Sequence, residues 1–418
     1  MLCTQCGKEL EEGRRFCIFC GAEQEPAGAG GAQQGPAPGK TPGMSTMAKV
    51  IIGVVAVLVV AGAAVGTYFG VRSSSSNKPG SSQTTTITTP NTGVTSAKSE
   101  KLAYINSKDI YTIDLNGAAQ HQITSRGDIV DFALAPDGSR IAFVAAPGDQ
   151  RIIFKMRPDG SDVSQVTLPE KGLAENPAFD PTGKYIYFIR VSPEDQTNTK
   201  AGQPYGVGFE RYDIAANKVD HLYTYGGLQE QSIEGLYADP SGGALYFNLF
   251  GSDWPSSVPH KLSLGPPVTE SVYMPMQRDT GKYTAVAFQV TGFSRDSTYV
   301  SYFKSALLVE QNSQTGPMQE VDACFKRVTS GEEKVATTYV PSQTQQGDVS
   351  GMEFSNVANA TYYFAKVQSG SSATSPLILE FYKGKTDRSL TPVGLNVSIA
   401  METEQYTPLV WHLLPVEK

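Results

Sequence analysis

The chain has 418 residues, with 34 Lys and Arg against 41 Asp and Glu, a formal net charge of −7 and 40% hydrophobic residues. This balance excludes a generally basic nucleic-acid-binding protein, and 18 Phe and 20 Tyr exclude a chain too poor in large side chains to form a core. Four of the 5 cysteines lie within the first 20 residues. The chain is therefore a mosaic, and its segments need separate interpretation.

Residues 1–22 contain two C-x2-C-G motifs whose thiolates are Cys3, Cys6, Cys17 and Cys20. Four thiolates on two short turns can surround one tetrahedral Zn²⁺, and a site with four protein ligands is structural because it leaves no position for water. The alternatives are two disulfides in an oxidising compartment, or iron. Basic and acidic residues balance within this segment, so we expect no nucleic-acid partner for it. The two motifs, with Phe16 just before the second, resemble the small zinc-ribbon module found at the start of many bacterial membrane proteins.

Residues 23–46 are rich in Gly, Pro and Ala and predict a flexible linker. Residues 47–71 then predict a transmembrane helix, because residues 50–71 contain no charge and a helix of that length would cover about 33 Å. A cleavable signal peptide would stand nearer the N-terminus and have a shorter apolar run. Gly62, Gly66 and Gly70 would lie on one helix face and offer a surface for self-association, although glycine is common in such helices anyway.

The flanking charges are two basic residues on each side of this span, so they do not decide its orientation. A four-cysteine zinc site is safer in the reducing cytosol, and we therefore expect the N-terminus to be cytoplasmic and the C-terminal part to be outside a cell membrane. Residues 72–100 are rich in Ser and Thr and predict a solvated stalk that holds the next domain away from the membrane.

Residues 101–418 contain a repeated hairpin motif in which a Pro-Asp-Gly-like turn separates two aromatic-rich strands. It occurs at residues 132–143, 179–188 and 237–247, with weaker copies at 293–302 and 354–364. Proline presets φ, a polar residue bonds the local backbone and glycine accepts positive φ, so the chain reverses. In every copy an aromatic residue stands seven positions after the anchor, and the anchors are Pro136, Pro181, Pro240, Arg295 and Val357.

A second motif, I-Y…N-G…Q-I-T, begins at Ile110 and returns 43 residues later at Ile153. Two hairpins make a four-stranded antiparallel blade, and repetition of such a blade predicts an all-β domain, a six-bladed β-propeller of four-stranded blades. The first unit lacks an inner strand, and residues 406–411 look like that strand. We therefore expect the C-terminal strand to pair with the first blade and close the ring. Both motifs resemble the WD40-like repeats of the TolB family of six-bladed propellers.

Catalytic signatures are missing from this sequence. There is no G-x-S-x-G motif and no hydrolase domain after the repeats, and His121, His221, His260 and His412 are scattered. Asp128, Asp131 and Asp137 form a loose acidic group that we interpret as turn caps. Cys324 is unpaired, and it is interpreted as a strand residue or a weakly exposed thiol. Aromatic residues in inserts between strands could pack loops or form a binding surface, and they are Tyr205, Phe209 and Trp254 beside Pro255.

The sequence therefore predicts a single-pass membrane protein with one structural Zn²⁺ and an extracytoplasmic TolB-like propeller. The propeller is expected to act as a scaffold for an unknown protein or ligand. The protein is not expected to be an enzyme. One alternative is a transmembrane sensor whose propeller binds an external ligand and whose ribbon engages a cytosolic partner. The other is a hydrolase or lyase that uses the propeller's central pocket. No nucleic-acid partner is expected.

Overall fold

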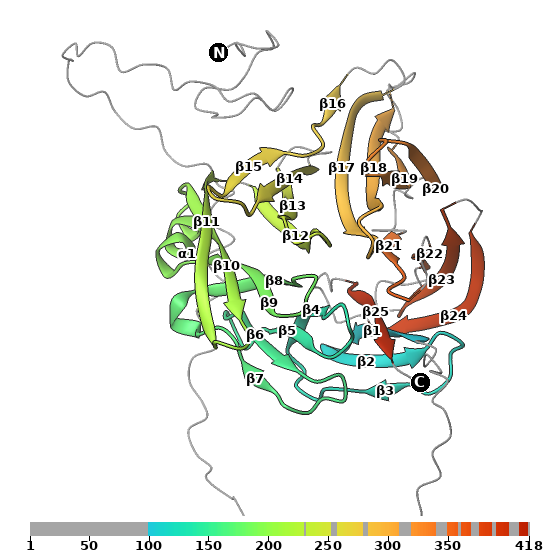
Figure 1. The fold of residues 1–418 in the computed structure, drawn as a ribbon, viewed down its shortest axis with the longest axis horizontal. Coiled ribbons are helices and arrows are strands. Elements are labelled where there is room, and N and C mark those ends of the chain that lie inside the picture. The colour runs from blue at the N-terminus through green and yellow to red at the C-terminus, as the bar shows by residue number, and fades with distance from the viewer. Residues whose placement is uncertain are drawn as a thin grey trace, which may run out of the picture. The chain divides into compact units, whose positions relative to one another are not determined.

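The computed structural model describes residues 99–416 except 230, 252–256, 279–282, 309–318, 340–348, 358–360, 369–375, 387–389 and 401–408. These residues form six antiparallel sheets arranged around one axis, which is a six-bladed β-propeller (Figure 1). The predicted all-β class and the predicted six blades are both confirmed for this part of the chain.

The first three blades contain the following strands, given from the axis outward. Blade 1 has β25 (Trp411–Val416), β1 (Ser99–Asn106), β2 (Asp109–Asp114) and β3 (His121–Gln122). Blade 2 has β4 (Ile129–Leu134), β5 (Ile141–Ala145), β6 (Ile152–Met156) and β7 (Ser164–Gln165). Blade 3 has β8 (Leu173–Phe179), β9 (Tyr185–Val191), β10 (Tyr205–Asp213) and β11 (Lys218–Leu228).

The remaining blades follow the same order. Blade 4 has β12 (Ser232–Ala238), β13 (Ala244–Phe250), β14 (Ser257–Ser263) and β15 (Thr269–Val272). Blade 5 has β17 (Tyr283–Phe293), β18 (Tyr299–Leu308), β19 (Gln319–Arg327) and β20 (Glu333–Tyr339), with the short β16 (Gln277–Arg278) paired to β17. Blade 6 has β21 (Val349–Phe354), β22 (Thr361–Gln368), β23 (Leu377–Lys385) and β24 (Thr391–Ile399). Two short helices, η2 (Pro169–Lys171) and α1 (Pro193–Lys200), precede and follow the first two strands of blade 3.

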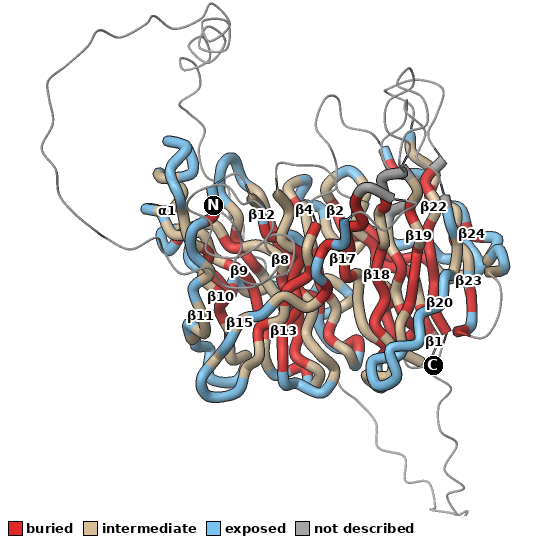
Figure 2. Tube along the Cα trace, turned by 90° about the horizontal axis from the view of Figure 1, so that it is seen from above, coloured by how far each residue is buried: buried red, intermediate tan, exposed pale blue. Residues whose placement is uncertain are grey.

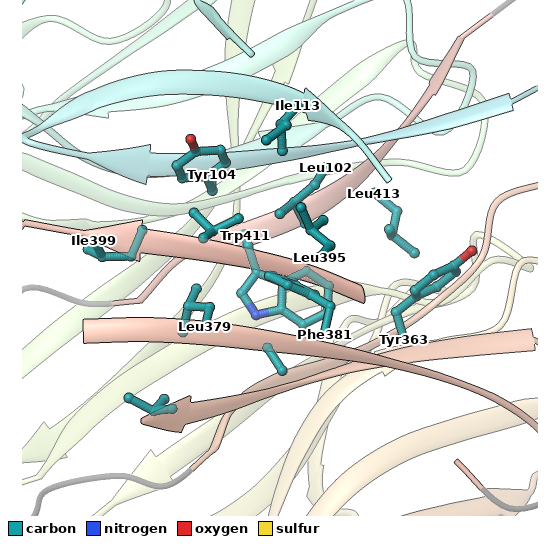
Figure 3. Close-up of a cluster of buried hydrophobic side chains, with 13 residues drawn as sticks. Leu102, Tyr104, Ile113, Tyr363, Leu379, Phe381, Leu395, Ile399, Trp411 and Leu413 are labelled. Carbon is teal, nitrogen blue, oxygen red and sulfur yellow. The ribbon is translucent and has the colours of Figure 1, made fainter. Parts of the chain in front are cut away.

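The hydrophobic core is divided among the interfaces between neighbouring blades. Buried residues fill the strands rather than the connections (Figure 2), and they form six clusters in the described part of the chain. The cluster between blades 6 and 1 contains Phe381 and Trp411, whose ring centroids lie 5.2 Å apart with the planes nearly perpendicular (Figure 3). Edge-to-face packing of this kind is favourable for aromatic rings.

The repeated aromatic of the hairpin motif belongs to these clusters. It stands on the second strand of blades 2 to 6, and Tyr104 occupies the matching place in blade 1, opposite Tyr111. Each of these side chains is at most 1% exposed, and they are Tyr104, Phe143, Phe188, Phe247, Tyr302 and Phe364. The two weakest copies, which lack the Pro-Asp-Gly turn, keep this aromatic. The buried aromatic side chain at the blade interface is therefore present in every copy of the repeat, whereas the Pro-Asp-Gly turn is not.

The two copies of the second motif form the same hydrogen bonds in blades 1 and 2. The hydroxyl of Thr124 accepts a hydrogen bond from the Ile110 N–H at 2.9 Å, and the hydroxyl of Thr167 accepts one from the Ile153 N–H at 2.9 Å. In both copies the Gln two residues earlier donates to the carbonyl of this Thr at 2.7 Å. The Q-x-T sequence thus satisfies backbone groups that the two-residue outer strand leaves unpaired.

The C-terminal strand closes the ring, as predicted. β25 pairs with β1 from Tyr104 opposite Trp411 to Ser99 opposite Val416. The predicted bounds were wrong, because the strand is Trp411–Val416 rather than residues 406–411. β1 likewise begins at Ser99, two residues before the predicted start of the propeller at residue 101.

The closing strand β25 approaches the neighbouring blade 2 so closely that one turn residue of that blade must be glycine. Gly138, in the turn between β4 and β5, has φ +75°, and a Cβ at this position would lie 2.1 Å from the Pro415 carbonyl oxygen. The glycine of the Pro-Asp-Gly turn is therefore required both by its backbone conformation and by the approach of the closing strand.

The N-terminal predictions lie outside the described residues. This applies to the ribbon, the linker, the span at 47–71 and the stalk up to residue 98. Within residues 99–416, with the gaps given above, the model contains no helix with the length and apolar character needed to cross a membrane.

Candidate functional site

A cavity of about 980 Å³ lies on the axis of the propeller. The innermost strand of every blade contributes to its wall, so residues from both ends of the domain face the same space. One lining residue from each of these strands is, in blade order, Trp411, Phe132, Ala178, Leu236, Thr291 and Met352. A concave, largely apolar space with a few polar groups is the usual form of a ligand site.

Bulges in the innermost strands place charged side chains in this cavity. β4, β8, β12, β17 and β21 each shift register against the next strand of their blade. A bulge adds a residue, bends the strand and re-aims the side chains beside it. Asp131, Glu175 and Glu234 lie directly at three of these shifts, and Glu353 lies two residues after a fourth. All four acids line the cavity.

His412, on the closing strand, joins three consecutive blades. Its Nδ1 lies 3.5 Å from the Glu353 carboxylate of blade 6, and its Nε2 lies 2.9 Å from the Phe132 carbonyl oxygen of blade 2. Both neighbours are hydrogen-bond acceptors, an arrangement that favours the protonated form of the ring. Glu353 also accepts from the Leu413 N–H at 3.0 Å. Burial lowers the pKa of His412, but the carboxylates of Glu353 and Asp131 outweigh it and the pKa is raised.

Asp131 stands beside this imidazolium at the bulge of β4. Burial, with a smaller contribution from the neighbouring Glu175 carboxylate, raises the pKa of Asp131 to about 7. The positive charge of His412 and the Phe132 N–H, which donates to Asp131 at 2.8 Å, lower it less than burial raises it. Asp131 therefore changes charge near neutral pH.

The opposite wall holds a phenol among carboxylates. Burial raises the pKa of Tyr237, and so do the negative charges of Asp131, Glu234 and Glu353, which keeps the hydroxyl protonated. These three acids come from blades 2, 4 and 6, so they are spread around the axis. Glu175, on blade 3, lies 3.5 Å from Arg151 instead.

The predicted zinc ligands Cys3, Cys6, Cys17 and Cys20 lie outside the described residues, as does the glycine ladder Gly62, Gly66 and Gly70. Two C-x2-C thiolate pairs are a donor set that fits a tetrahedral Zn²⁺ site. In the part of the chain that the structure describes, no three His, Cys, Asp or Glu side chains are grouped so that they could hold a metal ion.

The acidic group predicted near residue 130 separates into three roles. Asp128 pairs with Arg126 at 2.9 Å, and Asp137 accepts from the Ser139 N–H at 2.9 Å in the hairpin turn. Asp137 therefore caps its turn as predicted, whereas Asp128 is held in an ion pair. Asp131 faces the cavity instead, because the bulge turns it toward the axis.

The four histidines are also in different surroundings. His121 is exposed on β3, and the exposed ring of His221 lies 3.1 Å from Glu210. His260 is buried and lies 2.5 Å from Glu270. His412 is the exception to the scattered pattern, since it lies in the cavity among charged groups.

The aromatic and thiol predictions are corrected in part. Tyr205 and Phe209 do not lie in an insert between strands but in β10, where Phe209 is fully buried. Trp254 and Pro255 lie outside the described residues. Cys324 is on strand β19, as predicted, and it is fully buried rather than weakly exposed.

Sequence reasoning missed Glu175, Glu234, Glu353 and the role of His412. A signal for the acids was present, because each stands four to six residues before the anchor of its hairpin, as Asp131 does. In their strands Asp131, Glu175 and Glu234 each stand opposite the residue that follows the repeated aromatic, whereas Glu353 stands opposite the residue before it. His412 had no such signal, because its strand follows no hairpin copy.

The N-terminal residues match a family model. The model describes a zinc-ribbon domain and matches residues 2–24, which supports the predicted ribbon and its metal. A comparison with curated proteins gives no match.

Solved structures with similar folds include TolB propellers. TolB from Acinetobacter baumannii is 16% identical with a TM-score of 0.48, and the match covers 77% of this chain and 68% of that one. An oligogalacturonate lyase solved with manganese is 12% identical with a TM-score of 0.44, covering 70% of each chain. A prolyl endopeptidase is 10% identical with a TM-score of 0.42, covering 72% of this chain and 50% of that one.

The expectation that the chain is not an enzyme is corrected. The solved structures with similar folds include proteins named as a lyase and as a prolyl endopeptidase. A propeller without a recognisable catalytic motif is therefore no ground for excluding an enzyme, because a fold does not determine a function.

Proposed function

We propose that this chain is a binding protein whose propeller takes its ligand or partner in the central cavity. The observation that carries the proposal is the cavity itself, whose wall combines the innermost strands of six blades with a small set of charged side chains. Such a site is held by the whole ring, so its geometry is fixed before a ligand arrives.

The segments before residue 99 support a membrane-anchored arrangement of this binding domain. The uncharged run at 50–71 has the length of a membrane span, and the polar residues at 72–98 form a tether of suitable composition. In this proposal the zinc ribbon lies in the cytosol, where its thiolates remain reduced, and the propeller lies outside the cell membrane. The Zn²⁺ stabilises the fold of the ribbon, which is too short to form a core.

The cavity is tested by obstructing it without altering its charges. Ser232 is an exposed residue at the start of β12 that lines the cavity, whereas Ser271 is exposed on β15, the outer strand of the same blade. We expect S232W to abolish recovery of partners that the wild-type full chain binds in a pull-down, because the indole occupies the ligand space. S271W should recover them as the wild type does.

Equal recovery of partners by both variants, each with wild-type thermal stability, would show that binding does not use the cavity. Loss of recovery by S271W alone would place the binding surface on the outside of blade 4. Either result would contradict the proposed function.

A further inference from the structure

The charges that line the cavity are not fully compensated. Glu175 lies 3.5 Å from Arg151, and Glu353 lies 3.5 Å from the protonated His412. Asp131 and Glu234 have no basic side chain within 4.0 Å in the described part of the chain. An unpaired carboxylate in a partly desolvated space favours a ligand that brings the opposite charge.

Two further cations line the cavity but serve other groups. Arg295 donates to the Asn356 carbonyl oxygen at 3.0 Å, at the level of the hairpin turns. His412 and Glu175 are the charged groups that influence the pKa of Asp131, and burial above all raises the pKa of Glu234. Asp131 of blade 2 and Glu234 of blade 4 are therefore the two lining acids without an ion pair among the described residues.

Tyr237 adds a hydroxyl group to this region. Its hydroxyl has no hydrogen-bond partner among the described residues, and it lies against Gly235, where a Cβ would approach the hydroxyl oxygen to 2.6 Å. Because Gly235 has no side chain, the phenol of Tyr237 can lie against the backbone at the bulge of β12. A protonated hydroxyl that faces three carboxylates has free lone pairs, which suit a donor-rich cation.

The size and wall of the cavity indicate which kind of cation fits. The acids come from alternate blades and are too dispersed to coordinate one metal ion, since no such group of three occurs in the described residues. Aromatic side chains, including Phe132 and Trp411, form part of the wall. Aromatic faces and separated carboxylates together favour an organic cation with both apolar and charged parts.

We propose that the cavity binds an organic cation, an alkylammonium or guanidinium group, between Asp131 and Glu234 with the Tyr237 hydroxyl as a third contact. This inference rests on the proposed function, because it names the ligand class of the same cavity. The group could belong to a lysine or arginine side chain of a partner protein or to a free polyamine.

The test is a titration of the full chain with small cationic probes. Binding is measured by calorimetry and by tryptophan fluorescence, because Trp411 lines the cavity. The W254F background removes the second tryptophan. The probes are spermidine, a blocked tetrapeptide with two lysines, the same peptide with two arginines, and a neutral peptide with norleucine in their place. We expect a cationic probe to bind and the norleucine peptide to bind at least about tenfold more weakly, since charge-assisted hydrogen bonds contribute about 1.5–3 kcal/mol.

Variants then locate the site. D131N and E234Q should each weaken binding of the cationic probe about tenfold, and Y237F should weaken it less. D162N is the matched control, because Asp162 is an exposed acid on the outer part of blade 2. It should bind as the wild type does. Thermal unfolding of each variant checks that the fold is intact.

The outcomes separate the ligand source from the proposal itself. Binding of spermidine alone indicates a free polyamine, and binding of the peptides indicates a side chain of a partner. If no cationic probe binds, or if D131N and E234Q bind as the wild type does, the cation proposal is overturned. In that case, loss of partner recovery by S232W would still support the cavity as the binding site, whereas unchanged recovery would remove the proposed function as well.

Discussion

Asp131 is a residue whose charge is set by its place at a strand bulge. The backbone turns it into the cavity, where burial raises its pKa to about 7 from an ordinary value of 3.8. Between these two pH values the folded protein retains a proton that the unfolded chain has released. Stability must therefore fall as the pH rises through this window. His412 acts in the same direction, because its raised pKa gives stability at low pH that is lost when the ring deprotonates.

This linkage gives a prediction for D131N. The wild type should lose more thermal stability between pH 5 and pH 8 than D131N does, by on the order of 1–2 kcal/mol. Glu353 and Glu175 remain in both proteins, whereas D131N removes a charge that raises the pKa values of His412 and Tyr237. The smaller rise in the His412 pKa also reduces the loss of stability with pH in the variant. Calorimetric melting at the two pH values measures the difference. Parallel pH profiles for the two proteins would show that Asp131 is ionised throughout.

At the scale of elements, the closing strand β25 carries the same kind of packing as the internal strands. Leu413 is fully buried between blades 6 and 1 (Figure 3). Its N–H donates to Glu353, and its carbonyl accepts from the Asn356 side chain at 3.1 Å. These backbone contacts do not depend on the leucine side chain. Substitution of Leu413 therefore tests packing at the closure alone.

We expect L413A to lower the free energy of unfolding by about 2–5 kcal/mol, because it removes buried methyl groups and leaves a cavity. Val335 on β20 is 50% exposed, and V335A should change stability by less than about 0.5 kcal/mol. Urea denaturation of the two variants measures both values. A cost for L413A as small as that for V335A would mean that blade 1 is not held by its C-terminal strand.

The hairpins could be predicted from sequence because their turn chemistry and buried aromatics are local patterns. The aromatic seven residues after each anchor identified even the two copies that lack Pro and Gly, since it fills a blade interface in all of them. The bulges could not be predicted in this way, because a bulge is a relation between two strands and leaves no fixed residue in either. Asp131 was therefore interpreted as a turn residue. The predicted bounds of the closing strand were wrong for the same reason, because its position depends on the contact between Trp411 and Phe381.

At the scale of the whole molecule, the propeller is a ring of six interfaces that is completed within residues 99–416. Residues 1–49 contain 5 basic and 5 acidic residues and leave 29 against 36 downstream, so the net charge lies in residues 50–418. The proposed orientation has residues 1–46 in the cytosol and the propeller outside the cell membrane.

Cysteine labelling tests this orientation with little background. Cys324 is fully buried and burial raises the pKa of its thiol, so it should not react with a maleimide in the folded ring. The four ribbon thiols are expected to be protected by Zn²⁺. A new thiol in the S81C variant, in the predicted stalk, should therefore react with a membrane-impermeant maleimide on intact cells. In the S45C variant, in the predicted linker, the thiol should react only after permeabilisation.

The pattern of labelling discriminates between the arrangements. Reaction at position 45 but not at position 81 on intact cells would reverse the orientation and place the propeller inside. Reaction at both positions on intact cells would mean that residues 47–71 do not separate two compartments. Protection of both until permeabilisation would contradict an external propeller, because a solvated stalk outside the membrane has nothing to shield its thiol.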